Sequence, residues 1–264
     1  MKTTILAAAV IFATSAFAAP GTAARWSNHA SRRAQRKSGF MQPAKDNDIL
    51  AKVNETDKDV IYSDNWAGAI LNSSGFTSVV GTIIVPEPQS TGEDASASAW
   101  VGIDGLTCST AILQTGIDFS VTSGGSVSYT AWYEWYPDDS YEFSEFSVSA
   151  GDEVKMTVVA TSKAAGTATL ENLTTGQTAS HSFRNERNQL CESEAEWIVE
   201  DYEYHGALVT FANFDSVTFT DATAFKGDSA VDLADATILN IEQDNAVLTD
   251  CSTDSVSTVT CSYV

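Results

Sequence analysis

More than ten short segments rich in Val, Thr, Ser, Ile and aromatic residues follow one another from about Tyr62 to the C-terminus, and they constrain the fold most. Turn residues separate them, and helix signals are nearly absent. Strands in series with turns between them predict an all-β domain, either an antiparallel β-sandwich or a jelly roll. The expected strands are residues 76–85, 98–103, 111–119, 126–137, 141–149, 153–162, 167–171, 178–183, 195–202, 207–214, 216–220, 236–242 and 255–264.

The first 18 residues have the organisation of a secretory signal peptide. Lys2 precedes an apolar run over residues 5–12, and Ala16-Phe17-Ala18 supplies a small-x-small cleavage site. The run is too short to anchor the chain in a bilayer, and no later stretch is long and apolar enough for a membrane helix. We therefore expect a secreted, extracellular protein.

Charge divides the remaining chain into two parts. Residues 19–58 contain eight of the 14 Lys and Arg residues and only four acids, whereas residues 59–264 contain five basic and 31 acidic residues, a formal charge of −26. An acidic body repels nucleic acid and anionic membranes, and the opposite charges favour an association of the two parts. We interpret residues 19–58 as a prosegment of uncertain C-terminal boundary, and residues 59–264 as the folded domain. The alternative is a solvated basic tail that stays attached.

The chain has four cysteines, which in a secreted protein favour two disulfides. Cys251 and Cys261 flank a segment that can form a hairpin, which leaves Cys108 and Cys191 to pair. No Cys-x-x-Cys or paired-histidine motif indicates a metal site, and we expect no cofactor. Sequons begin at Asn54, Asn72 and Asn172.

An acidic stretch, residues 190–202, contains alternating apolar and acidic positions. As a strand it would place Ala195, Trp197 and Val199 on one face, and Glu196 and Glu200 on the other with Ile198. The simplest interpretation is a strand with one solvated face. The same alternation elsewhere puts polar side chains among aromatic ones on one face of three further segments, which carry Trp100 and Asp104, Gln114 and Asp118, and Trp132, Glu134 and Tyr136.

These residues leave two classes of function open. A carboxylate beside indole rings is partly desolvated, which raises its pKa and favours acid-base chemistry. No Gly-x-Ser-x-Gly motif or aspartic-protease motif is present, so serine and aspartic peptidases are disfavoured. A carboxylate-based peptide hydrolase and a glycoside hydrolase or lectin both remain possible, and so does an aromatic face that binds nothing.

Six motifs in the same order are similar to those of the glutamic peptidase family, the eqolisins. They are Ser63-Asp-Asn-Trp-Ala-Gly-Ala-Ile70, Ala99-Trp-Val-Gly-Ile-Asp-Gly105, Ala111-Ile-Leu-Gln-Thr-Gly116, Ala131-Trp-Tyr-Glu-Trp-Tyr-Pro137, Glu171-Asn-Leu-Thr-Thr-Gly-Gln177 and Ala195-Glu-Trp-Ile-Val-Glu-Asp201. The resemblance implies a lectin-like, concanavalin-like sandwich of two bent antiparallel sheets. It also implies a monomeric, pepstatin-insensitive acid endopeptidase that acts on proteins or peptides, with its own prosegment as intramolecular inhibitor.

The resemblance implies a catalytic dyad of Glu200 and Gln114. Glu200 would act as general base and then acid, and Gln114 would stabilise the oxyanion. The supporting positions that it implies are Trp100, Asp104, Asp118, Trp132, Glu134 and Tyr136. It gives Glu196 no role. Some members carry a further disulfide shortly after the catalytic glutamate, and residues 202–206 contain no cysteine. A glycoside hydrolase would instead use Glu134 together with Glu200.

Overall fold

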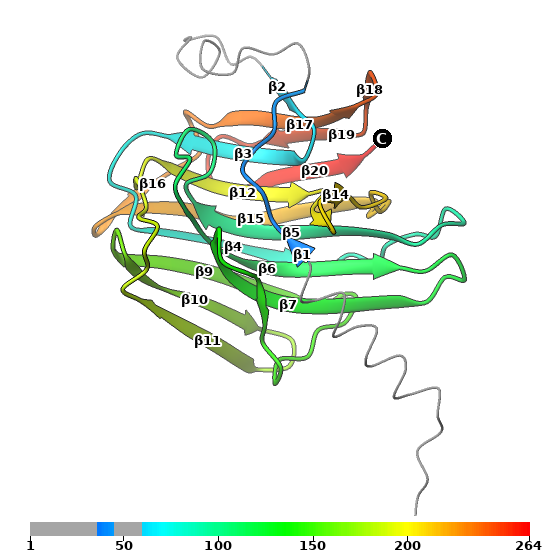
Figure 1. Ribbon diagram of the computed structural model, residues 1–264, viewed down its shortest axis with the longest axis horizontal. Coiled ribbons are helices and arrows are strands. Elements are labelled where there is room, and N and C mark those ends of the chain that lie inside the picture. The colour runs from blue at the N-terminus through cyan, green and yellow to red at the C-terminus, as the bar shows by residue number, and fades with distance from the viewer. Residues whose placement is uncertain (1–35, 45–59) are drawn as a thin grey trace, which may run out of the picture.

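The computed structural model describes residues 36–44 and 60–264 (Figure 1). The predicted signal peptide and most of the predicted prosegment lie outside these ranges, so those boundaries stay predictions. Residues 36–44, called the N-terminal segment below, lie against the folded body. Among the described residues no helix is long and apolar enough to cross a membrane.

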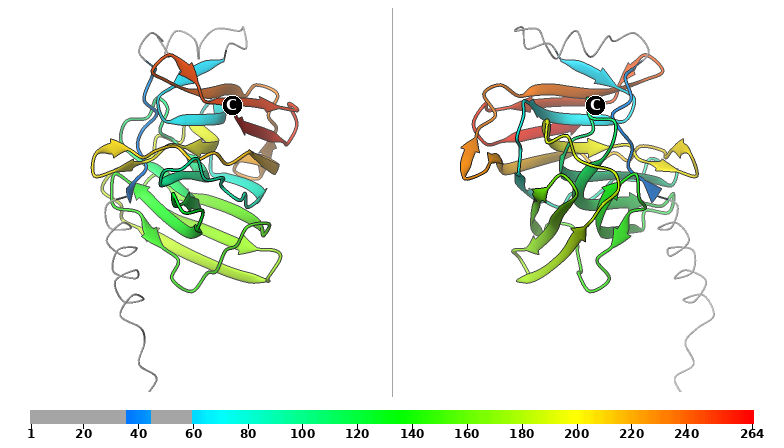
Figure 2. Two further views of the ribbon diagram at one scale, coloured as in Figure 1. Left: turned by 90° about the vertical axis from the view of Figure 1, so that its right-hand side faces the viewer. Right: turned by 60° about the vertical axis from the view of Figure 1, so that its left-hand side comes forward.

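Two large sheets and one small sheet make up the body (Figures 1 and 2). The nine-stranded sheet contains, in spatial order, β18 (Ala246–Val247), β17 (Thr237–Gln243), β3 (Trp66–Asn72), β12 (Glu194–Glu200), β5 (Ala95–Ile103), β6 (Ile112–Val121), β7 (Val127–Tyr136) and β8 (Tyr141–Glu142), with β2 (Ile61–Ser63) beside β17. The eight-stranded sheet contains β11 (Gln177–Arg184), β10 (Ala165–Asn172), β9 (Glu153–Ser162), β4 (Ser78–Ile84), β15 (Ser216–Lys226), β20 (Val259–Tyr263) and β19 (Thr249–Thr253), with β16 (Ser229–Val231) beside β15.

The small sheet joins the N-terminal segment to the body. It contains β1 (Arg36–Lys37), β13 (Glu203–Tyr204) and β14 (Ala207–Leu208). All pairings between these named strands are antiparallel, except that of β2 with β17. The predicted antiparallel β-sandwich is confirmed.

The main hydrophobic core lies between the two large sheets. Alternation along β12 directs Ala195, Trp197 and Val199 into it, and all three are fully buried. The Trp197 indole N–H donates a hydrogen bond to the Val80 carbonyl of the facing sheet at 2.7 Å. Gly81 provides the room for that indole, because a Cβ there would lie 2.9 Å from the ring. The apolar face predicted for this strand is therefore confirmed.

A second apolar cluster covers the opposite, outer face of the nine-stranded sheet. Its members are Met41, Ile61, Trp66, Ile70, Trp100, Ile112, Trp132, Ile198 and Leu239. Phe40 packs against this cluster and meets Tyr136 edge-on at 4.7 Å between ring centroids. The N-terminal segment thus shields an outer sheet face that also carries the polar side chains singled out above.

Some strand predictions were wrong in part. Residues 207–214 form a strand only at Ala207–Leu208, followed by isolated bridges at Phe211 and Asn213. Residues 141–149 form a strand only at Tyr141–Glu142, because Phe143 and Phe146 are both buried and a turn, closed by a hydrogen bond from the Phe146 N–H to the Phe143 carbonyl, directs both inward. Strand β3 was not among the expected strands. It is buried on both faces and rich in Ala and Gly, so it shows neither alternation nor β-type composition.

Both predicted disulfides are present. Cys251 and Cys261 lie opposite each other in the β19–β20 hairpin, and Cys108 is bonded to Cys191, which lies just before β12. The second bond connects the chain after β5 to the start of the acidic stretch. Each cross-link reduces the conformational freedom of the unfolded chain.

Candidate active site

Strand register brings the predicted dyad to one face of the nine-stranded sheet. Ser98 on β5 pairs with Glu200 on one side and with Asp118 on the other, and Gly102 of the same strand is paired with Gln114. Residues two apart on a strand share a face. Gln114 and Glu200 therefore project from the same outer face, with Trp100 between their two rows. Both are fully buried.

Two tryptophans hold the carboxylate of Glu200. The Trp66 indole N–H donates to Oε1 at 3.3 Å, and the Trp100 indole N–H donates to Oε2 at 3.0 Å. The two indoles meet edge-on at 4.9 Å. Burial raises the pKa of Glu200 to about 6, although Arg36 and the hydrogen bonds that the carboxylate accepts act in the opposite direction. The raised pKa would allow Glu200 to exchange a proton in moderately acid medium.

Two further carboxyl groups, those of Glu134 and Asp118, lie on the same sheet face as Gln114. The Gln114 amide Nε2 donates to Glu134 Oε2 at 3.2 Å, while Oε1 of Gln114 has no hydrogen-bond partner. Burial raises the pKa of Glu134 to about 8, and burial also raises the pKa of Asp118. Arg36 opposes both shifts. Gln114 thus has one end of its amide fixed by Glu134.

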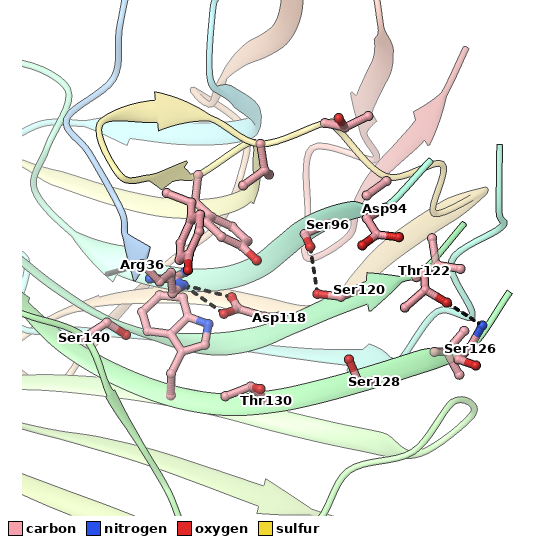
Figure 3. A pocket seen from close by; sticks show the side chains of 18 of the residues that line it. Arg36, Asp94, Ser96, Asp118, Ser120, Thr122, Ser126, Ser128, Thr130 and Ser140 are labelled. Carbon is pink, nitrogen blue, oxygen red and sulfur yellow. Dashed lines mark hydrogen bonds and ion pairs between the residues drawn. The ribbon is translucent and has the colours of Figure 1, made fainter. Parts of the chain in front are cut away.

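The guanidinium of Arg36 lies among these acids (Figure 3). It binds Asp118 through Nε at 2.9 Å and Glu134 through Nη1 at 3.3 Å, and it donates from Nη2 to Ser98 at 3.3 Å. It also stacks over the Trp132 ring at 3.9 Å. Nearby acids raise the pKa of Arg36 against the effect of burial, so it remains a cation.

The next residues of the N-terminal segment contact the predicted base directly. The Ser38 hydroxyl donates to Glu200 Oε2 at 2.9 Å, and the Gly39 backbone N–H donates to Oε1 at 3.1 Å. Further along, the Met41 N–H donates to the Gly105 carbonyl. The dyad is therefore covered by the chain's own N-terminal segment.

A cavity of about 640 Å³ extends from Arg36 over β5, β6 and β7 (Figure 3). Hydroxyl groups form much of its lining, from Ser96, Ser120, Thr122, Ser126, Ser128, Thr130, Ser140 and Thr210. A hydroxyl both donates and accepts hydrogen bonds, as a peptide backbone requires of its partner. The cavity therefore offers both donors and acceptors of hydrogen bonds to a polar ligand, next to Arg36 and Asp118.

Five of the six predicted supporting residues lie on this face, and Asp104 has a separate place. Its carboxylate accepts hydrogen bonds from the backbone N–H groups of residues 191–194, at 2.7 to 3.3 Å. Asp104 is in the left-handed region with φ 73°. It therefore holds the disulfide-linked loop that leads into β12.

Several residues at the site were not predicted. Trp66 lies in one of the quoted motifs, but its strand was not recognised. Ser98 is the polar residue two before Trp100 on the same strand, and alternation could have indicated it. Arg36 and Ser38 belong to a basic stretch with no local pattern that distinguishes them from its other members.

Comparisons with known sequences identify the family of this chain. The model of the peptidase A4 family matches residues 64–263. Aspergillopepsin-2 of Aspergillus niger is 48% identical over 100% of both chains, and scytalidopepsin B of Scytalidium lignicola is 44% identical over 99% of this chain and 98% of the relative.

Solved structures show the same fold. Scytalido-glutamic peptidase with a transition state analog inhibitor has a TM-score of 0.69 and 47% identity, over 76% of this chain and 98% of the solved one. Aspergilloglutamic peptidase from Aspergillus niger has a TM-score of 0.62 and 57% identity, over 64% and 99%. The chain therefore belongs to the peptidase A4 family, the eqolisins, and is a glutamic endopeptidase.

Proposed function

We propose that this protein is a secreted acid endopeptidase, made as an inactive precursor, in which Glu200 and Gln114 are the catalytic dyad. The observation that carries the proposal is the placement of a buried carboxylate, held by two indole N–H groups, on the same sheet face as a buried amide. Of the neighbouring carboxyl groups, Glu134 accepts a hydrogen bond from the Gln114 amide, which suits it to orient that amide rather than to act as the base.

In the proposed reaction Glu200, once ionised, takes a proton from a water molecule as its oxygen attacks the peptide carbonyl carbon. The Gln114 amide N–H groups stabilise the negative charge that develops on the carbonyl oxygen. Glu200 then returns the proton to the amide nitrogen while the C–N bond breaks. The products are a carboxylic acid and an amine, and Glu200 is ionised again.

The proposal extends to regulation by the N-terminal segment. Arg36 neutralises the acids of the cleft, while Ser38 and Gly39 occupy the hydrogen-bonding positions of Glu200 that a water molecule would need. The segment belongs to the basic stretch interpreted as a prosegment. It acts as an intramolecular inhibitor near neutral pH and leaves when the acids are protonated.

The solved relatives support a peptide as the substrate. Scytalido-glutamic peptidase has been solved with a peptide based transition state analog, and SCP-B, a member of the eqolisin family, with the tripeptide Ala-Ile-His. These ligands are compatible with the hydroxyl-lined cavity described above. We expect no requirement for a cofactor, and we expect insensitivity to pepstatin.

Two variants test the dyad. Glu200→Gln and Gln114→Ala should each reduce cleavage of denatured casein in acid by about 100-fold or more, with circular dichroism unchanged. Near-normal cleavage by either variant contradicts the assignment. Incubation of the wild type with a panel of polysaccharides tests the alternative. A glycoside hydrolase would cleave them and would need Glu134 but not Gln114, and a lectin would cleave neither class of polymer.

A further inference from the structure

Glu196 is a buried acid to which the proposed reaction gives no role. It is fully buried on β12, and among the described residues neither of its carboxyl oxygens has a hydrogen-bond partner. A buried polar group without a partner is costly, so such groups in a folded protein have a structural or functional reason. Burial, and then the charges of Glu194 and Asp104, raise the pKa of Glu196 well above its usual range. A neutral carboxyl group carries an O–H that can donate a hydrogen bond.

Strand register places Glu196 in one row with the amide of the dyad. Glu196 pairs with Gly102, Gly102 pairs with Gln114, and Gln114 pairs with Glu134. Neighbouring strands are about 4.8 Å apart, so the backbones of Glu196 and Gln114 are separated by roughly 10 Å. All four residues present the same outer face of the sheet.

Gly102 leaves the middle of this row without a side chain. A Cβ at this position would lie 3.3 Å from Glu196 Oε2 and 2.8 Å from the Trp100 ring. The Glu196 carboxyl group therefore leans over the glycine, in the direction of Gln114. On the far side of the glycine, Gln114 has Nε2 bound to Glu134 and Oε1 without a partner.

We propose that Glu196 is a positioning residue that donates a hydrogen bond from its neutral carboxyl group to Oε1 of Gln114 across Gly102. This contact fixes the carbonyl end of the Gln114 amide, as Glu134 fixes the other end, and so determines which way the N–H groups point. The inference rests on the proposed role of Gln114 in stabilising the oxyanion. A misoriented amide would present its oxygen, not its N–H groups, to the developing negative charge.

Glu196→Leu and Glu196→Gln in the acid-activated protein test the inference. Leu removes the donor, so kcat should fall about tenfold to 100-fold with KM within about twofold, because the lost interaction acts in the transition state. Gln keeps a neutral N–H donor of the same length, so it should retain most of the activity. The melting temperature of Glu196→Leu should change little, because the gain from replacing a buried carboxyl group by an apolar side chain offsets the loss of the hydrogen bond to Gln114 Oε1.

Glu194→Gln is the matched control on the same strand and face. Glu194 is buried but already accepts hydrogen bonds from Thr107 and from the Cys108 backbone. Its substitution should lower the melting temperature and leave kcat within about twofold of the wild type, because burial, the largest cause of the raised pKa of Glu196, persists without the Glu194 charge. If Glu196→Leu does not fold, Glu196→Met provides an unbranched replacement that also lacks the donor.

Three outcomes overturn the inference. Wild-type kcat in Glu196→Leu or Glu196→Met excludes a positioning role, and so does a loss of activity that follows a loss of stability. Equal losses in Glu196→Gln and Glu196→Leu show that an ionisable group is needed at this position, and not merely a donor. Failure of the proposed function is distinguishable, because the wild type would then not cleave peptides, or Gln114→Ala would cleave them normally.

Discussion

The Arg36 guanidinium lies 2.9 Å from the Asp118 carboxylate, although 82 residues separate the two in sequence and both are buried. This contact joins the basic N-terminal region to the acidic body within the site that contains the dyad. A buried ion pair is poorly screened by salt, and removal of one member leaves the other charge without compensation. The basic N-terminal region and the acidic body are therefore joined by a specific ion pair, and not only by their opposite net charges.

Arg36→Ala in the full chain should weaken the inhibition by the N-terminal segment. Truncation of one member of a buried, hydrogen-bonded charge pair costs about 2–5 kcal/mol, which corresponds to at least about 30-fold in the equilibrium between the covered and the open site. The variant should cleave a fluorogenic peptide near pH 6 without prior incubation in acid.

Lys37→Ala is the control for this variant, because Lys37 is the adjacent cation on β1 and its side chain is exposed. It should remain as inactive as the wild type before acid treatment. Equal activation of both variants would mean that inhibition depends on total charge rather than on the Arg36 site.

Binding of the prosegment should weaken as pH falls. Arg36 pairs with Asp118 and Glu134 and interacts favourably with the charge of Glu200, so its attraction to the site is strongest where these carboxyl groups are ionised and decreases as they take up protons. A synthetic peptide of residues 19–58 can be titrated against acid-activated enzyme. Its inhibition constant should rise as pH falls from 7 to 4, by up to about tenfold per pH unit for each proton that the uncovered site binds in excess of the covered one.

The same peptide with Ala in place of Arg36 is the control, and its inhibition constant should depend less on pH. An inhibition constant of the unmodified peptide that is the same at pH 7 and pH 4 would contradict the electrostatic mechanism.

Trp66→Phe should move the acidic limb of the pH profile of kcat/KM to higher pH. The Trp66 indole N–H stabilises the ionised form of Glu200, so its removal raises the pKa of that carboxyl group. We expect a shift of about one pH unit, equivalent to about 1.4 kcal/mol. Trp197→Phe removes an indole N–H that binds Val80 in the core between the sheets, and it should lower stability without moving the limb. A limb that stays in place in Trp66→Phe would show that ionised Glu200 is not the base.

Asp104→Ala should destabilise the fold more than it affects the chemistry. It deprives the backbone N–H groups of residues 191–194 of their acceptor, so we expect a loss of about 2–4 kcal/mol in the free energy of unfolding. Asp104→Asn keeps one acceptor oxygen and should lose less. Denaturant unfolding measures both variants, and equal stability of Asp104→Ala and the wild type would contradict the structural role.

The sequon at Asn172 should carry no glycan in the folded, secreted protein. The Asn172 side chain is buried, and its Nδ2 donates to the Ser147 carbonyl and to Asp152 at 3.2 and 2.9 Å. A glycan attached to that nitrogen would break these bonds and expose the turn. Asn72 is exposed and is the internal comparison. Peptide mass spectrometry settles the question, and a glycopeptide that contains Asn172 would contradict the prediction.

Alternation predicted correctly the faces of β12, β6 and β7, because each strand has a distinct composition on its two sides. Alternation also predicted that Trp197 lies in the core and that Glu200 lies on the opposite face of the sheet. It did not predict that Glu200 would be buried, because the cover is the N-terminal segment, far away in sequence. Local pattern indicates the face on which a side chain lies, but not what lies above that face.

The sequence by itself determined the all-β class, the division of charge and the two disulfides, since these depend on local composition and on cysteine count and spacing. Only the tertiary structure decided that Arg36 lies on Asp118, and that Gly102 separates Glu196 from Gln114 in one row across the sheet. Such contacts depend on the register of strands far apart in the chain. Register follows from the packing of the whole sheet, because a shift of one residue would turn every side chain of a strand to the other face.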